Sequence, residues 1–283
     1  MPVSLSGMPS PVPDLTEVPD RGKRVYVVSY PNSGRTWLRV MLSRYKQLLV
    51  GFDEFQVKLH AHYSASPASP QYIFFHAASD TPAPRTFWSR LCGAPPAYPL
   101  NLSACDGSRV IFLVRDPRDV VVSNYYEVAK RQRRFRGTLS AFVRDRWFGI
   151  DRLIHFCNAI HEYSQRTGGC LFVSYEELGV RPEIVVRRIC EFSGAAIVDD
   201  LLRESVRYAS FENMKVLEQE NRLVRGADAR AGGNSQVQKV RKGKAGGYVD
   251  ELSPDDVAFI DRKLRTELAA FFHASPFAWA PNV

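Results

Sequence analysis

The sequence predicts a single three-layer α/β domain with a mainly parallel central sheet. The segments Val110–Val114 and Cys170–Ser174 lack polar alternation, which is typical of strands buried on both faces of a parallel sheet. Segments of strand character alternate with segments of helical character along the chain, as in α/β folds. Near its start the chain also has an apolar strand, a tight turn and a helix in direct succession, so a P-loop-like strand–loop–helix unit is expected.

Turn and capping signals place the elements in chain order. Residues 1–22 are rich in Pro and Ser and are expected to form a disordered arm, which leaves 23–283 as the folded domain. Residues 222–248 are rich in Gly and charge and are expected to form a mobile lid. Ser253 as N-cap predicts a last helix that runs to about Phe272. The other predicted elements are strands at 24–30, 72–76, 110–114 and 170–174, helices at 34–50, 117–130, 138–147, 150–167, 181–193 and 198–208, and surface loops at 63–70 and 80–100.

The composition fits one globular domain in a reducing compartment. The chain has 283 residues, of which 45% are hydrophobic and 24% charged. Its five cysteines form no C-x-x-C pair, which favours buried thiols over a disulfide frame or a zinc site. No apolar run approaches the roughly 20 residues that span a membrane, and no signal peptide is evident, so a cytoplasmic protein is expected. The net charge of +8 suits an anionic ligand or nucleic acid and decides between neither.

Polar segments follow three of the predicted strands. They are Ser29–Thr36, Arg115 and Ser174–Glu176, and they would converge on one crevice because ligands bind at the carboxyl ends of parallel strands. The first segment leads into a helix whose N-terminus carries partial positive charge and unpaired N–H groups, so it is expected to bind a phosphate or sulfate-like anion. It is no Walker A loop, because Arg35 stands where that motif has its Lys.

Five blocks occur in the same order as in the cytosolic-type sulfotransferases that use 3′-phosphoadenosine-5′-phosphosulfate (PAPS). They are Ser29-Tyr-Pro-Asn-Ser-Gly-Arg-Thr-Trp37, Arg115-Asp-Pro-Arg-Asp-Val-Val-Val-Ser123, Phe172-Val-Ser-Tyr-Glu-Glu-Leu178, Ser210-Phe-Glu-Asn-Met-Lys215 and Arg241-Lys-Gly-Lys-Ala-Gly246. The sequence therefore resembles this family from residue 29 to residue 246. The resemblance implies transfer of a sulfuryl group from PAPS to a hydroxyl or amine of a small-molecule acceptor, with no metal ion.

The resemblance also implies a task for each block. Backbone N–H groups of residues 33–37 would hold the 5′-phosphate, since a helix N-terminus favours anions. Arginine suits the 3′-phosphate because its planar guanidinium makes paired, charge-assisted bonds. The implied donor-binding residues are Asn32, Ser33, Gly34, Arg35 and Thr36 in the loop, Arg115, Ser123, Arg241, Lys242 and Gly243 for the 3′-phosphate, Trp37 and Phe211 as an adenine sandwich, and Tyr175 and Met214 as pocket lining.

His76 is the implied catalytic base, because it ends a predicted strand at the family's catalytic position and imidazole titrates near neutral pH. Two family lysines are replaced, one by Asn32 in the loop and one by Phe74. Arg35 is the candidate for the missing charge and is assigned with His76 as catalytic. The family's C-terminal dimer segment is not matched either: Val249, Ser253 and Pro254 stand at its Lys, Thr and Val positions.

Several alternatives remain open from the sequence. A P-loop kinase or nucleotidase would share the strand–loop–helix, and a non-catalytic nucleotide-binding or nucleic-acid-binding protein would explain Asn32 and the basic run Lys130–Arg136. A solvated helix end or loop is the favoured interpretation of this run, and the H-x-H pair at His60 and His62 has no evident third metal ligand. Arg115 could have a structural role and only pair with Asp116 or Asp119. Four other residues could be ordinary packing residues of the core: Trp37, Tyr175, Phe211 and Met214. The acceptor is not readable, and neither nucleic acid nor a membrane span is expected.

Overall fold

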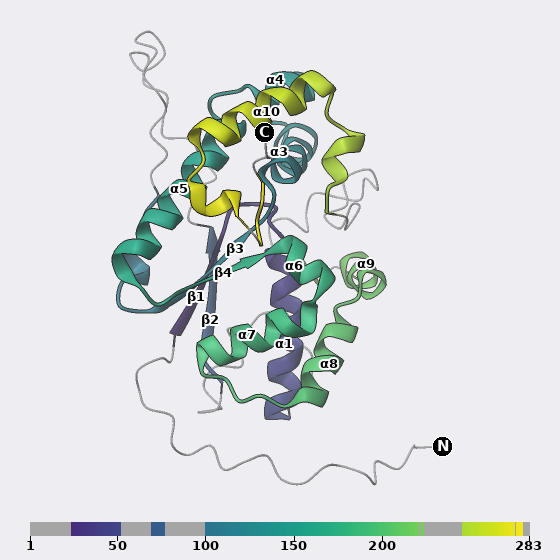
Figure 1. The fold of residues 1–283 in the computed structure, drawn as a ribbon. Coiled ribbons are helices and arrows are strands. Elements are labelled where there is room, and N and C mark those ends of the chain that lie inside the picture. Colours follow the sequence, from purple (N-terminus) through teal and green to yellow (C-terminus); the bar gives the residue numbers. More distant parts are fainter. Residues whose placement is uncertain are drawn as a thin grey trace.

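Four parallel strands form the centre of the protein, which a computed structural model describes for residues 24–51, 69–76, 100–220, 222–223, 245–274 and 276–279 (Figure 1). The strands are β1 (Arg24–Ser29), β2 (Gln71–His76), β3 (Arg109–Val114) and β4 (Cys170–Ser174). Their order is β2-β1-β3-β4, and every neighbouring pair is parallel. The predicted α/β class and the predicted parallel sheet are confirmed.

Helices cover both faces of the sheet, so the fold has three layers (Figure 1). Successive strand residues point to opposite faces, and each face has its own apolar cluster. Val27 and Leu113 belong to the cluster under α1 (Arg35–Val50), α7 (Pro182–Ser193) and α8 (Asp199–Tyr208). Val28 and Phe112 belong to the other, under α3 (Pro117–Tyr125), α5 (Ile150–Thr167) and α10 (Pro254–Glu267).

Shorter helical segments connect these elements. They are η2 (Ser103–Cys105), η3 (Tyr126–Arg131), α4 (Leu139–Val143), α6 (Tyr175–Val180), α9 (Phe211–Gln219), η5 (Gly247–Asp250) and η6 (Ala270–His273). Of these, α6 and α9 were not expected from the sequence. Each begins after a serine cap: Ser174 Oγ accepts the Glu177 N–H at 3.0 Å, and Ser210 Oγ accepts the Asn213 N–H at 3.3 Å. The two caps start α6 and α9 at the edge where the candidate site lies.

Three predicted helices end earlier than expected. The helix from Pro117 gives way to a π-helical turn after Tyr125. The helix predicted at 138–147 ends at Val143, because the Asp145 carboxylate accepts the N–H groups of Trp147 and Phe148 and forms a turn. The last helix ends at Glu267, where the backbone of Leu268 becomes extended. Of the three ends, the one after Val143 has a side-chain cause, which is the turn formed by Asp145.

Some expectations fall outside the described residues. These are the arm at 1–22, the histidines at 60 and 62, and most of the predicted loops at 63–70 and 80–100. Of the predicted lid, only 222–223 and 245–248 are described, so the domain boundaries stay a prediction. The basic run Lys130–Arg136 is mostly exposed, at the end of η3 and the start of the next loop. Among the helices that the structure describes, none has the length and hydropathy needed to cross a membrane.

A candidate nucleotide site at the carboxyl edge of the sheet

Each of the four strands that the structure describes bears, at its carboxyl end, a residue or loop that the sequence assigns to the site. The loop before α1 follows β1, Arg115 follows β3, Tyr175 follows β4 and His76 ends β2. From β1 the chain first adds β2 on one side and later β3 on the other. The switch point therefore lies between β1 and β3, which is where open α/β sheets bind ligands.

The loop after β1 is a tight turn that only particular residues fit. Asn32 has φ 65° and Gly34 has φ 93°, both in the left-handed region. A Cβ atom at Gly34 would lie 2.4 Å from Cδ2 of Tyr175, so the ring of Tyr175 occupies the space that any side chain at this position would need. The Trp37 N–H donates to the Gly34 carbonyl at 3.0 Å. The loop thus leads directly into the first turn of α1 at the carboxyl edge of the sheet.

Arg115 contacts three segments at this edge of the sheet. Its Cζ lies 4.2 Å from the centre of the Tyr175 ring, a cation–π distance. Its Nη1 donates to the Asn32 carbonyl at 3.4 Å, and its Nη2 lies 3.5 Å from Asp119 Oδ2. Of the two pairings left open by the sequence, the structure therefore contains the one with Asp119. Asp116 forms a bidentate pair with Arg118.

Trp37 connects the loop to the segment that carries Phe211. Its ring meets Tyr175 edge-on with 5.6 Å between centroids, and its Nε1 donates to the Ala209 carbonyl at 2.7 Å. Two residues later Phe211 begins α9, with Lys215 Nζ 4.4 Å from its ring centre. Met214 is buried in the apolar cluster that lies under α1. The two aromatic residues expected around the adenine are thus brought to the same edge of the sheet.

The remaining predicted site residues are placed less directly. Ser123 is half-buried on α3, one helical turn after Asp119 and on the same face. The backbone of His76 is in register with Ser29, the residue that leads into the loop, and its side chain lies outside the described part. Arg35 is the first residue of α1 and is half-buried, while Ser33 is buried and Thr36 half-buried. Arg241, Lys242 and Gly243 lie outside the described residues.

An arginine that sequence reasoning missed lies near the second lysine replacement. Arg39 is one turn after Arg35 on α1, and its Cζ lies 5.3 Å from the centre of the Phe74 ring. Phe74 precedes His76 by two residues in β2. The helical spacing of Arg35 and Arg39 was the available signal in the sequence. Only the fold, in which β2 pairs with β1, brings Phe74 beside Arg39.

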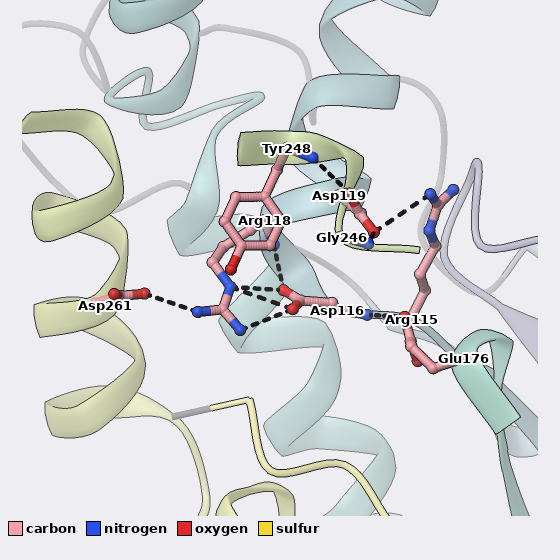
Figure 2. Close-up of polar contacts among 8 residues, drawn as sticks. All are labelled: Arg115, Asp116, Arg118, Asp119, Glu176, Gly246, Tyr248 and Asp261. Carbon is pink, nitrogen blue, oxygen red and sulfur yellow. Dashed lines mark hydrogen bonds and ion pairs between the residues drawn. The ribbon is translucent and has the colours of Figure 1, made fainter. Parts of the chain in front are cut away.

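Three carboxylates around Arg115 were also missed as a group (Figure 2). Asp116 caps α3 by accepting the Arg118 N–H at 2.9 Å, and its own N–H donates to Glu176 Oε1 at 3.0 Å. The other oxygen of Glu176 is buried and has no hydrogen-bond partner among the described residues. Burial raises the pKa of Glu176 to about 7, and it raises the pKa of Asp116 as well, although Arg118 opposes the latter shift. Asp119 is the third carboxylate. Within the described ranges, no three His, Cys, Asp or Glu residues are grouped to hold a metal ion.

Comparisons with known proteins agree on one family. The pattern of the sulfotransferase domain matches residues 22–272. Cytosolic sulfotransferase 13 of Arabidopsis thaliana is 26% identical over 88% of this chain and 78% of its own length, and human Sulfotransferase 2A1 is 25% identical over 88% of this chain and 85% of its own. The crystal structure of retinol dehydratase in a complex with retinol and PAP has a similar fold, with a TM-score of 0.60 at 16% identity over 88% of this chain and 82% of that one. The chain belongs to the sulfotransferase family, whose members transfer sulfuryl groups.

Proposed function

We propose that this protein binds PAPS at the carboxyl edge of its sheet and transfers the sulfuryl group to a hydroxyl or amine of a small molecule. Family membership supports the reaction class. The observation that carries the donor assignment is the meeting of the Asn32–Gly34 loop, Arg115 and Tyr175 at the switch point. These groups belong to three separate strand ends, and together they suit an adenine nucleotide with phosphates at two positions.

The chain's own groups fit such a donor. The loop and the first turn of α1 offer backbone N–H groups to the 5′-phosphate, which requires the close approach that Gly34 permits. Asn32 has a buried Nδ2 with no partner among the described residues, so a donor is available beside the loop carbonyls. Arg115 and Ser123 would take the 3′-phosphate. Trp37 and Phe211 would stack on the adenine, as aromatic faces do with bases.

The reaction is an in-line displacement at sulfur. PAPS supplies a sulfuryl group on a phosphate oxygen that leaves easily. The acceptor oxygen or nitrogen forms the new bond to sulfur while the bond from sulfur to the 5′-phosphate oxygen breaks, which leaves 3′-phosphoadenosine-5′-phosphate (PAP). His76 would accept the proton of the attacking group from the end of β2, where its backbone is in register with Ser29. Positioning and charge stabilisation would supply most of the rate.

The departing oxygen needs a cation, because negative charge grows on it as the bond to sulfur breaks. With Asn32 and Phe74 at the two lysine positions, α1 offers the nearest arginines in the sequence, Arg35 and Arg39. Arg35 begins the helix that follows the loop, and Arg39 reaches the Phe74 ring at 5.3 Å. Either guanidinium can serve this role.

A donor assay with a broad acceptor panel tests the function. The fold neighbour retinol dehydratase was solved with retinol and with androsterone, both alcohols, so these two compounds join phenols, amines and sugars in the panel. We expect transfer of label from sulfur-labelled PAPS to at least one acceptor, with release of PAP. Binding of PAP without transfer to any member of the panel would favour a nucleotide-binding protein without catalysis. Magnesium-dependent turnover of ATP would favour a kinase-like enzyme. The cytoplasmic location and the lid at 222–248 stay predictions.

A further inference from the structure

One buried carboxylate connects the corner after β3 with the segment that precedes α10 (Figure 2). Asp119 is 3% exposed and lies in the first turn of α3. Its Oδ2 accepts the Gly246 N–H at 2.7 Å, and its Oδ1 accepts the Tyr248 N–H at 2.9 Å. The same Oδ2 lies 3.5 Å from Arg115 Nη2. Both oxygens are therefore engaged, and the carboxylate joins the end of β3 to the start of η5.

The corner receives a second connection from Arg118. Its guanidinium pairs with Asp116 on one side and with Asp261 of α10 on the other, where Nη1 and Oδ1 are 3.1 Å apart. It also lies over the ring of Tyr248, with 4.7 Å from Cζ to the ring centre. Gly246 has φ 72°, a left-handed conformation that glycine adopts without strain, and this geometry turns its N–H toward Asp119. The start of η5 is thus held at two points, one of which also touches Arg115.

We propose that Asp119 is a positioning residue for the donor: it holds Arg115 and the backbone at Gly246 and Tyr248 in one arrangement, so that donor affinity depends on it and turnover at saturating donor does not. The inference deepens the proposed function and rests on it, because Arg115 is assigned to the 3′-phosphate there. A flexible arginine loses side-chain entropy when it binds, and an ion pair that already restricts it reduces that loss.

The negative charge of Asp119 could instead oppose an anionic donor, and the two effects predict opposite signs. Two backbone N–H groups donate hydrogen bonds to this carboxylate, and one guanidinium forms an ion pair with it. Its charge is therefore largely balanced within the protein, and positioning outweighs repulsion. In Asp119→Asn one acceptor oxygen becomes an NH₂ group, which would face either the Gly246 N–H and Arg115 or the Tyr248 N–H, so one contact must break.

The test compares Asp119→Asn with Asp256→Asn. Asp256 is an equally buried aspartate on α10, at 3% exposure, that binds Ser140, Ser253 and Arg144, none of which is assigned to the donor site. We expect Asp119→Asn to raise the KM for PAPS and the Kd for PAP about tenfold, with kcat within about twofold of wild type, the size of one lost positioning contact. We expect Asp256→Asn to lower the melting temperature and to leave both constants unchanged. Tighter or unchanged PAP binding by Asp119→Asn would overturn the proposal.

The wild-type protein supplies a second test that needs no variant to fold. The amide protons of Gly246 and Tyr248 are expected to exchange slowly with deuterium in the absence of nucleotide, because Asp119 holds them. Exchange of both amide protons at the rate of an unprotected amide would contradict the proposal that Asp119 holds this segment. Calorimetry of wild type and Asp119→Asn with PAP distinguishes failure of the proposed function from failure of the role of Asp119. Absence of PAP binding by wild type contradicts the proposed function. Equal binding by the two proteins contradicts only the role of Asp119.

Discussion

Gly34 and Tyr175 are packed so closely that no side chain fits between them. A Cβ atom on Gly34 would be 2.4 Å from Cδ2 and 2.9 Å from Cε2 of the Tyr175 ring. The two residues follow β1 and β4, which are separated in the sheet by β3. The contact therefore fixes the loop against the far strand end, and Arg115 from β3 completes it by covering the same ring.

Gly34→Ala is expected to lower both stability and PAP affinity. The left-handed backbone alone costs a residue with a Cβ about 1–2 kcal/mol, and here the Tyr175 ring must move as well. Gly51→Ala is the matched control, because Gly51 has φ 79° and a Cβ atom there would meet nothing within 4 Å in the described part of the chain. Denaturant unfolding and PAP calorimetry measure the two effects. Equal losses in both variants would show that the contact with Tyr175 has no separate importance.

His76→Ala is expected to lower turnover by about 10²–10⁴-fold while the Kd for PAP stays close to that of wild type, because a general base acts on the acceptor proton and not on the nucleotide. Single-turnover kinetics with PAPS and the best acceptor measure this. His155→Ala is a suitable control, since His155 is exposed on α5. Near-normal turnover of His76→Ala would remove His76 as the base.

The missing lysine charge is tested by comparing Arg35→Ala with Arg39→Ala. The guanidinium that steadies the departing oxygen acts mainly in the transition state, so its removal is expected to lower kcat by about 10²-fold or more with a small change in PAP affinity. The sequence favours Arg35, which lies next to the loop, whereas the contact with Phe74 favours Arg39. If neither variant loses kcat, the cation comes from another part of the chain.

Glu176 is expected to make stability fall as the pH rises. Burial raises its pKa from the ordinary value of 4.5 to about 7, although the hydrogen bond from the Asp116 N–H and the charge of Arg115 oppose the rise. The unfolded chain then releases this proton near pH 4.5 and the folded chain only near pH 7, so the contribution is fully present below pH 4.5 and is lost through this window. Glu176→Gln removes the dependence, and its advantage over wild type should grow by about 2–3 kcal/mol between pH 4.5 and pH 8.

Urea unfolding of both proteins at half-unit steps of pH measures this difference. The unfolding free energy of wild type should decline relative to that of Glu176→Gln, while the Asp116 N–H keeps an acceptor in both proteins. Two curves that stay parallel from pH 4.5 to pH 8 would mean that Glu176 is not held in its protonated form near neutral pH.

The sequence predicted the elements that depend on local pattern. All four strands lie where apolar runs placed them, and the helices at 34–50, 150–167 and 198–208 agree with the structure to within one residue. The capping pattern Ser253-Pro254 also gave the correct start of α10. These signals lie within a few residues of one another, so they can be recognised without knowledge of the fold.

Contacts between segments that are distant in the chain could not be predicted from the sequence. Nothing near Asp119 in the sequence indicates that Gly246 and Tyr248, more than a hundred residues later, donate to its carboxylate. The raised pKa of Glu176 likewise depends on how β3 and β4 bury it. Short helices such as α6 escaped prediction because one serine cap starts them and few residues follow to reveal a periodicity.

The central claim is that Arg115 recognises the 3′-phosphate of an adenine nucleotide, and calorimetry with PAP and with 5′-AMP tests it most directly. The two ligands differ only in that phosphate. Wild type is expected to bind PAP at least about tenfold more tightly than 5′-AMP, since one charge-assisted bond contributes roughly 1.5–3 kcal/mol, and Arg115→Ala is expected to lose most of this preference. Equal affinity of wild type for the two nucleotides, or an unchanged preference in Arg115→Ala, would contradict the claim.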